Sequence, residues 1–331
     1  MACTLKTSNP ADFDTRVFKT RQLLDALDAS GHAKIQKEFW RARLMDPDQT
    51  FFDQFSQPPQ VLYKYIPAYR LDHALPDKTL CSFRATPPNK LNDINEMNYR
   101  TSFVDDESNR EKINQDFALA LTELFPTSPV SVDDVERYRQ KTPFGYGAEL
   151  TCDQLSKRYG VTSFSTKRND VRMWSHYADD CRGVAIGYNV DYWVTHLLGT
   201  SIVRQVGYAD ELPMIMDPRV VNQENAYAFM SSKGAAWEYE DEWRLITELS
   251  KTQRSGKDIS VITVPRSSVS SILVTDRTPQ DTVDIITRRL NNQSNGYRIW
   301  WIDKLQRGRD ANTLDFVGQI KTRAQPSFQT A

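Results

Sequence analysis

In the window KGAAWEYEDEWRLI, residues 233–246, which has four acidic residues, the carboxylates Glu240 and Glu242 and the guanidinium of Arg244 follow one another at intervals of two. Side chains two residues apart in a β-strand point to the same face, so a strand here would present all three groups together. A carboxylate pair in the wall of a pocket can orient or deprotonate a substrate and can stabilise positive charge that develops on a sugar. The alternative is a half-buried strand whose aromatic residues face the core and whose charged face is solvated.

Two other segments alternate like strands and carry polar groups. In VLYKYI, Lys64 lies on the face opposite the rings of Tyr63 and Tyr65. In VTSFST, Ser163 and Ser165 share one face. Hydroxyls at this spacing are common in strands that bind nothing, but they can also orient a ligand.

A polar loop supplies two further candidates. Asn92 and Asp93 occur in the segment LNDINE, after the proline turn that ends a predicted strand. Their side chains either bind polar atoms of a ligand or cap a turn.

The segment VRMWSHYADD predicts a helix that begins after Asp170. On this helix Arg172 and His176 are four residues apart, as are His176 and Asp180, so the three would line one side. A histidine held between a cation and a carboxylate is suited to proton transfer. The alternative is a helix that packs through apolar residues such as Trp174.

Composition excludes several classes of protein. The chain has 331 residues, 39% of them hydrophobic, and a formal net charge of -1, which fits a globular protein and demands neither nucleic acid nor an anionic membrane. We find no apolar run that could span a bilayer and no signal-peptide pattern, so we expect a cytoplasmic protein without membrane contact. Four scattered cysteines and four unclustered histidines predict no metal site, and dinucleotide-fold, P-loop and hydrolase signatures are absent.

The pattern of elements predicts an α+β fold with a mixed, mostly antiparallel sheet and flanking helices. Short strands outnumber long helices and do not alternate with them as strict βαβ units. We predict a helical N-terminal extension over 1–58, a main α+β domain over 59–303 and a weakly ordered tail over 304–331. The acidic window is predicted as a strand over 237–245.

The order of these segments resembles a bacterial group, domain of unknown function family 2971. The shared segments are YKY, LND, SFST, MWSHYADDCRGVAIGY, VGYAD and the WEYEDEWRLI window, and the chain looks like a member of the group from about 61 to 274. The combination of MWSHY with the pattern WxYExEWR is specific to that family. The family name implies no activity.

A weaker resemblance points to chemistry. Some ADP-ribosyltransferases present an aromatic strand with Arg or His, a strand with a Ser-Thr-Ser motif and a Glu-x-Glu motif, and LYKY, SFST and EDE are similar in order. Lys64 stands where Arg or His is expected, and Phe164 replaces the central Thr. Arg70 or Arg84 is a candidate for the missing cation. This resemblance implies an ADP-ribosyltransferase-like fold and NAD as substrate.

The resemblance also implies roles for the candidate residues. Glu242 would stabilise the oxocarbenium character that builds at the ribose when the nicotinamide bond breaks, and Glu240 would orient or deprotonate the acceptor. His176 is the third catalytic candidate. Hydroxyls would support the ribose, rings would cover nicotinamide or adenine, and a cation such as Lys64 or Arg244 would meet the pyrophosphate. The candidate nucleotide-binding residues are Tyr63, Lys64, Tyr65, Asn92, Asp93, Ser163, Ser165, Trp174 and Arg244.

Two functions of different class therefore remain open. The first is an NAD-consuming transferase or glycohydrolase, of the type used by bacterial toxins and antiphage effectors, with a protein or nucleic acid as acceptor. The second is a non-catalytic sensor or interaction module that binds a nucleotide, a nucleic acid or a protein. Convergence of Glu240, Glu242, Ser163 and Ser165 on one pocket, with a raised carboxylate pKa, would favour the enzyme.

Overall fold

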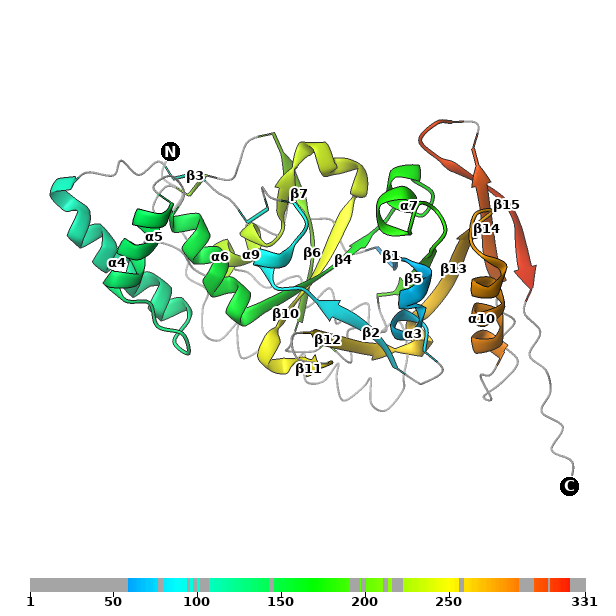
Figure 1. Cartoon of the computed structure of the whole chain (residues 1–331), viewed down its shortest axis with the longest axis horizontal. Helices are drawn as coiled ribbons and strands as arrows, with labels where there is room; N and C mark the ends of the chain where they lie inside the picture. Colours follow the sequence, from blue (N-terminus) through cyan, green and yellow to red (C-terminus); the bar gives the residue numbers. More distant parts are fainter. Residues whose placement is uncertain are drawn as a thin grey trace, which may run out of the picture.

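The computed structural model is shown in Figure 1. It describes residues 59–76, 80–93, 96–97, 100–101, 107–142, 146–190, 197, 201–210, 214–215, 223–255, 259–291, 301–308 and 310–321. The predicted N-terminal extension, 1–58, lies outside the described residues.

The centre of the fold is an eight-stranded sheet in the order β15-β14-β13-β5-β1-β4-β10-β6. Only the neighbours β13 and β14 run parallel, and every other neighbouring pair is antiparallel. This confirms the predicted α+β class with a mixed, mostly antiparallel sheet. In sheet order the strands are Leu314–Lys321, Trp301–Arg307, Val269–Thr275, Val184–Asn189, Val61–Ile66, Tyr159–Ser165, Glu242–Glu248 and Ser201–Gln205.

Smaller sheets complete the strand structure. A three-stranded sheet has the order β11-β12-β2, and two further sheets each have two strands, β3 with β8 and β7 with β9. Their strands are β2 Leu80–Ala85, β3 Arg100–Thr101, β7 Gly207–Ala209, β8 Met214–Ile215, β9 Ser232–Gly234, β11 Gln253–Arg254 and β12 Ser260–Pro265.

The α-helices form two groups, one on the left and one on the right of Figure 1. The α-helices are α3 Leu71–Ala74, α4 Arg110–Leu124, α5 Val132–Lys141, α6 Tyr146–Arg158, α7 Val171–Tyr177, α9 Gln223–Phe229 and α10 Gln280–Asn291. Helix α4 forms where apolar residues recur at helical spacing, and its Phe117 and Leu121 are fully buried. Helix α5 begins at a capping box between Ser131 and Asp134.

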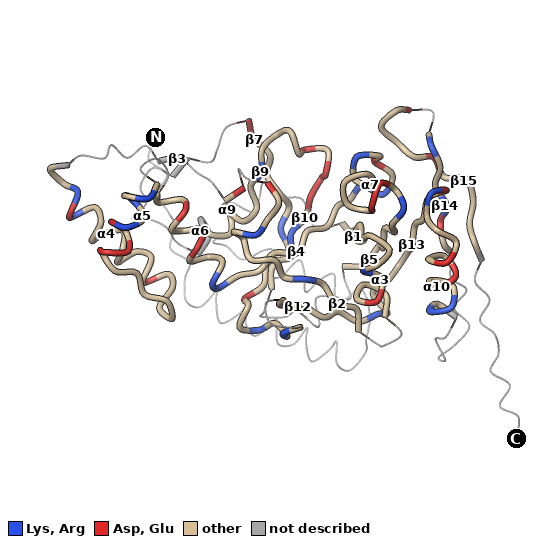
Figure 2. The backbone as a smooth tube through the Cα atoms, viewed as in Figure 1, with Lys and Arg blue, Asp and Glu red and all other residues tan. Residues whose placement is uncertain are grey.

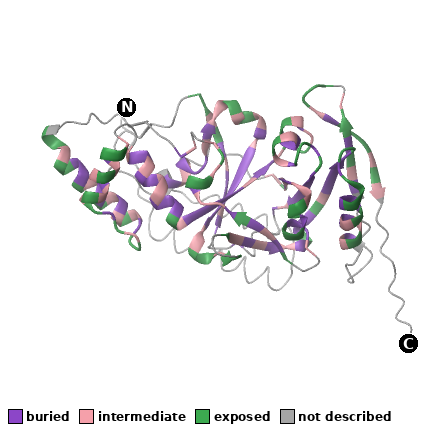
Figure 3. Ribbon diagram, in the orientation of Figure 1, coloured by how far each residue is buried: buried purple, intermediate pink, exposed green. Residues whose placement is uncertain are grey.

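The central strands are largely buried, as their purple colour in Figure 3 shows, and apolar residues of β10 pack on both faces. On β10, Trp243 and Leu245 belong to one buried apolar cluster, which includes Phe164. Ile246, on the opposite face of the strand from Leu245, belongs to a second cluster, which includes Phe117. Acidic and basic residues are spread along the described part of the chain in Figure 2, and the full sequence has a near-neutral net charge. Burial on both faces holds the central strands firmly, so they can fix the polar side chains they carry.

The acidic window is not the continuous strand that the alternation predicted. Residues Ala235–Glu240 form a 3-10 helix, η6, and β10 begins only at Glu242. Between them Asp241 adopts a left-handed conformation with φ of 43°, which Asp tolerates better than most residues. The Thr166 hydroxyl binds the Asp241 carboxylate and helps to hold this corner.

The helix predicted over VRMWSHYADD is shorter than expected. The Asp170 side chain caps it as predicted, accepting from the Arg172 amide at 2.9 Å. It ends at Tyr177, because the left-handed residues Asp179 and Asp180 turn the chain away. Helical spacing therefore does not continue from His176 to Asp180.

The predicted boundary at Asp303 is wrong, because β14 and β15 continue the large sheet to Lys321. The two strands form a ladder from Trp301–Lys321 to Arg307–Leu314, and Leu314 is buried. Few apolar residues suggested a weakly ordered tail, but backbone pairing supplies the order that side-chain burial does not. No helix in the described ranges is long and apolar enough to cross a bilayer.

Candidate functional site

The large sheet opens between β1 and β4. These strands are paired only at Tyr63 and Ser165, whereas β4 and β10 are paired along their full lengths. At its other end β4 pairs instead with Thr86, just after β2, through two backbone hydrogen bonds to Val161 of 2.8 and 2.7 Å. Two strands thus diverge from the same edge of β4 and leave a gap in the sheet.

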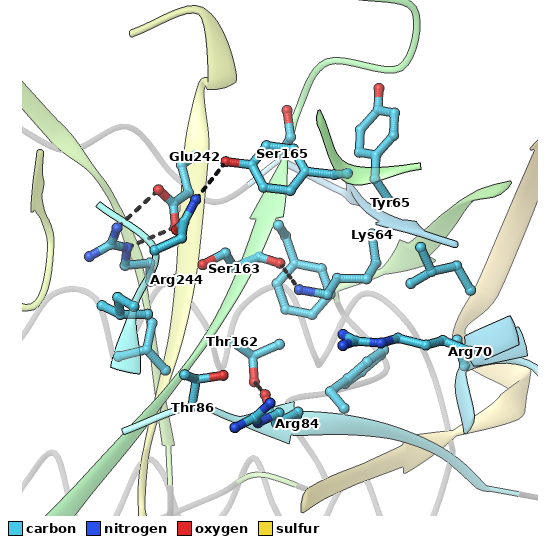
Figure 4. Close-up of a pocket in the computed structure, with 18 of the residues that line it drawn as sticks. Lys64, Tyr65, Arg70, Arg84, Thr86, Thr162, Ser163, Ser165, Glu242 and Arg244 are labelled. Atoms are coloured by element: carbon cyan, nitrogen blue, oxygen red, sulfur yellow. Dashed lines mark hydrogen bonds and ion pairs between the residues drawn. The ribbon is translucent and has the colours of Figure 1, made fainter. Parts of the chain in front are cut away.

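A cavity of about 650 Å³ occupies this gap, within the range of about 300–1,000 Å³ typical of ligand pockets. Lys64 of β1 lines the cavity, and its Nζ donates a hydrogen bond across the gap to the Ser163 carbonyl of β4 at 2.6 Å (Figure 4). Alternation places Lys64 and Tyr63 on opposite faces of β1, yet both line the cavity. The cavity therefore reaches both faces of the sheet through the gap.

At one end of the cavity two carboxylates share a cation. Lys233 Nζ lies 2.8 Å from Glu240 Oε2 and 3.3 Å from Glu242 Oε2. Arg244 donates to Glu242 through Nε at 2.8 Å and Nη2 at 3.0 Å, so it binds both carboxylate oxygens (Figure 4). At most 4% of any of these four side chains is exposed. Such close geometry is what a buried ion pair needs to offset the loss of hydration.

A third carboxylate, Glu96, joins the same group. It binds the Arg244 guanidinium and lies 3.5 Å from Lys233 Nζ. Its Oε2 is buried and has no hydrogen-bond partner among the described residues. With all groups ionised, the three carboxylates exceed the two cations by one negative charge.

The paired carboxylates have opposite pKa shifts. Burial, reinforced by the neighbouring Glu242, raises the pKa of Glu240 above its usual value, although the Lys233 ammonium and a hydrogen bond from Tyr177 oppose the change. Burial also opposes ionisation of Glu242. There the Arg244 guanidinium, Lys233 and the Ser163 hydroxyl outweigh burial and lower the pKa to about 2. One carboxylate is therefore held ionised, while its neighbour binds a proton more readily.

Neighbouring hydroxyls fix both acids. The Tyr177 hydroxyl donates to Glu240 Oε1 at 2.6 Å, and the Ser165 hydroxyl donates to the Glu240 carbonyl. The Tyr208 hydroxyl accepts from the Glu242 amide at 2.8 Å. These bonds connect α7, β4 and β7 to the corner that carries the acids.

Most of the predicted site residues meet in this cavity. Those that line it are Tyr63, Lys64, Tyr65, Asn92, Ser163, Ser165, Glu240, Glu242 and Arg244. Tyr63 lies against Gly187, where an added Cβ would be 2.9 Å from the ring. Asn92 donates to the Tyr177 hydroxyl at 3.4 Å.

Three predicted residues do not line the cavity. Trp174 is fully buried, packs edge-on against Tyr65 and donates to the Arg168 carbonyl at 3.1 Å, so it belongs to the core. Asp93 does not line the cavity either, and its backbone carbonyl accepts from the Glu96 amide at 3.1 Å in a turn.

The proposed proton-transfer setting of His176 is also wrong. The His176 side chain is exposed and lies against the Tyr239 ring. Arg172 instead pairs with Asp170 at 2.7 Å, and Asp180 pairs with Arg182 at 3.5 Å. Because the helix ends at Tyr177, the carboxylate expected one turn later is displaced.

Arg244 lines the cavity but is unsuited to bind a phosphate. Its Nη1 donates to the Met230 carbonyl at 2.8 Å, and its other nitrogens serve Glu242 and Glu96. Only 1% of the side chain is exposed. The residue neutralises the acids, and the cation expected at a pyrophosphate must come from elsewhere.

The sequence did not identify Lys233, Glu96 or Tyr177 as site residues, and Tyr177 was expected only to pack on the helix side opposite His176. Lys233 opens the acidic window, seven residues before Glu240, and a break in the strand was needed to bring it back to the acids. Glu96 is 148 residues from Arg244, and no local pattern links such positions. In the described part of the chain, no three His, Cys, Asp or Glu side chains are arranged to hold a metal ion.

A family model described as "Protein of unknown function (DUF2971)" matches residues 173–245. The matched segment contains both Glu240 and Glu242 with their partner cations, whereas Lys64 and Ser163 lie outside it. The resemblance to this family is supported over that segment. A search of curated proteins and a search of solved structures each found no match.

Proposed function

We propose that the chain cleaves the bond between nicotinamide and ribose in NAD and transfers ADP-ribose to water or to another acceptor. The observation that carries this proposal is a pair of carboxylates with opposite pKa shifts, Glu240 and Glu242, in one cavity with Ser163 and Ser165. Environments that separate the pKa values of two neighbouring acids are typical of catalytic pairs.

Glu242 is suited to the bond-breaking step. When the bond from ribose C1′ to the nicotinamide nitrogen breaks, its electron pair leaves with nicotinamide and positive charge develops on the ribose. A carboxylate that stays ionised at neutral pH can stabilise that charge and accept hydrogen bonds from ribose hydroxyls. The hydrogen bond from Ser163 and the two bonds from Arg244 hold Glu242 in place without reorganisation.

Glu240 is suited to the bond-forming step. As an acceptor hydroxyl attacks C1′, a new C1′–O bond forms and the acceptor proton must leave. A carboxylate with a raised pKa is a stronger base than an ordinary one, so Glu240 can take this proton. The hydrogen bond that the Tyr177 hydroxyl donates to Glu240 Oε1 orients the carboxylate.

The proposal is tested by nicotinamide release from NAD, with and without cell lysate as a source of acceptors. We expect release by the wild-type chain and at least about a hundredfold less by Glu242→Gln or Glu240→Gln, the range typical of general acid–base and electrostatic groups. Glu248→Gln is the matched control, because Glu248 lies on the same strand but pairs with Arg158 and Lys251 outside the cavity.

Circular dichroism must show that each variant is folded. Absence of release by a folded wild-type chain would overturn the proposal and favour a non-catalytic binding module. Equal release by the wild-type chain and both cavity variants would also overturn it, because the reaction would then occur elsewhere.

A further inference from the structure

The same cavity holds a second group of cations, distinct from the two that form ion pairs with the carboxylates. Lys64 of β1, Arg70 of the 3-10 helix η2 (Ala68–Arg70) and Arg84 of β2 all line it. In Figure 4 the Arg70 side chain extends into the cavity toward Lys64, and Arg84 lies on the opposite wall beside Thr162. Three separate elements thus supply three cations to one space.

These cations differ from those at the acidic end in their partners. Lys233 and Arg244 are each held by two or more carboxylates. Within the described residues, by contrast, no carboxylate forms an ion pair with Arg70 or Arg84. Burial is the main cause that lowers the pKa of Lys64; the Glu242 carboxylate opposes the change, and the positive charge of Arg70 adds to it.

We propose that Lys64, Arg70 and Arg84 bind the diphosphate group of a nucleotide. This inference deepens the proposed function and rests on it for the orientation of the substrate, with the glycosidic bond at the carboxylates and the diphosphate at the cations. One guanidinium group can bind two oxygens of a phosphate through two parallel hydrogen bonds. Two guanidinium groups and one ammonium can therefore bind the oxygens of two adjacent phosphoryl groups and offset their negative charge. The ligand class is therefore a diphosphate-bridged nucleotide rather than a nucleoside.

The exposed side of the cavity suits the base of such a nucleotide. Tyr69 precedes Arg70, lines the cavity and is 76% exposed, with the Arg70 guanidinium over its ring at 5.7 Å. Ile259, 42% exposed, also lines the cavity. The exposed Tyr69 ring provides a surface on which a base can stack. The lining then orders base, diphosphate and glycosidic bond from the exposed side inward.

Isothermal titration with ADP, AMP and adenosine tests the inference, because none of these probes requires cleavage. We expect ADP to bind at least about tenfold more tightly than adenosine, with AMP between them. Arg84→Ala and Arg70→Ala should each weaken ADP binding about tenfold and leave adenosine binding unchanged. Arg288→Ala on α10 is the matched control, since Arg288 is exposed and does not line the cavity.

Equal affinity for ADP and adenosine, or ADP binding unchanged in both arginine variants, would overturn the inference. Its failure is distinguishable from that of the proposed function. Nicotinamide release without preference for ADP would overturn the diphosphate site alone. Preference for ADP without release would support the diphosphate site while overturning the proposed reaction.

Discussion

Glu240 and Glu242 flank the left-handed residue Asp241, and both carboxylates form an ion pair with the same ammonium, at 2.8 and 3.3 Å from Lys233 Nζ. One is carried by the last turn of η6 and the other by the first residue of β10. The shared cation lets two buried carboxylates approach each other, because it offsets part of their mutual repulsion.

Removing the charge of Glu242 should destabilise the fold strongly. Glu242→Gln leaves Arg244 with one carboxylate fewer in a buried site, and breaking a buried pair in this way costs about 3–5 kcal/mol. We expect a loss of that size in the free energy of unfolding from urea titration at pH 7. Glu248→Gln, which breaks partly exposed pairs, should change stability by about 0–1 kcal/mol, and equal losses would contradict the assignment.

The contribution of Glu242 should vanish in acid. Its pKa is lowered from 4.5 to about 2 on folding, so the folded state binds the proton less readily than the unfolded chain does. Its stabilising contribution is therefore fully present above pH 4.5 and is lost as the pH falls from 4.5 to 2. Urea titrations across this range should show wild type and Glu242→Gln converging. A constant difference down to pH 2 would contradict the lowered pKa.

Removing the Tyr177 hydroxyl should raise the pKa of Glu240 further. The hydroxyl donates to Glu240 Oε1 at 2.6 Å, and that bond favours the ionised carboxylate. Tyr177→Phe should therefore shift the titration of Glu240 to higher pH, followed by carbon NMR of labelled glutamate. Tyr69→Phe, which alters an exposed ring, serves as the control, and an unchanged titration in Tyr177→Phe would refute the bond.

Binding of ADP should weaken as the pH rises through about 8. Burial lowers the pKa of Lys64 from 10.5 to about 8, with Glu242 opposing that change and Arg70 adding to it. Above this pH the free protein carries a neutral amine at the gap, and the attraction for phosphate falls. Titrations between pH 7 and 9 should show the loss in wild type but not in Lys64→Arg, whose guanidinium stays charged. A parallel loss in both proteins would assign the titration to another group.

Neighbouring residues of α7 should respond differently to truncation. Trp174→Ala removes a fully buried ring and should lower stability by about 3–5 kcal/mol. His176→Ala removes an exposed side chain outside the cavity and should change stability by less than about 0.5 kcal/mol, with nicotinamide release retained. Loss of release in a stable His176→Ala protein would restore the catalytic role predicted from sequence.

Strand alternation predicted much of the site. It grouped Ser163 with Ser165 and Glu242 with Arg244, and the ladder between β4 and β10 places Ser163 opposite Arg244 and Ser165 opposite Glu242. These predictions succeed because period-two alternation is a local property that the sheet preserves.

The failures have a different physical origin. The strand that was expected to include Tyr239 begins only after Asp241. The left-handed backbone conformation of Asp241 changes the direction of the chain there. The approach of Glu96 to Arg244 depends on how distant elements pack, and a spacing pattern does not record such packing. The convergence of Arg70 and Arg84 on one cavity depends on the gap between β1 and β4, which the pairing of distant strands creates.

The gap in the sheet also bears on how the site forms during folding. Its closing contact joins Lys64 to Ser163 across 99 positions of sequence, and Glu96 reaches Arg244 across 148. Contacts between residues so far apart in the sequence require a long loop to close first, and they typically form slowly. No short contiguous fragment contains the complete site, so binding and catalysis should appear only when folding of the large sheet is complete.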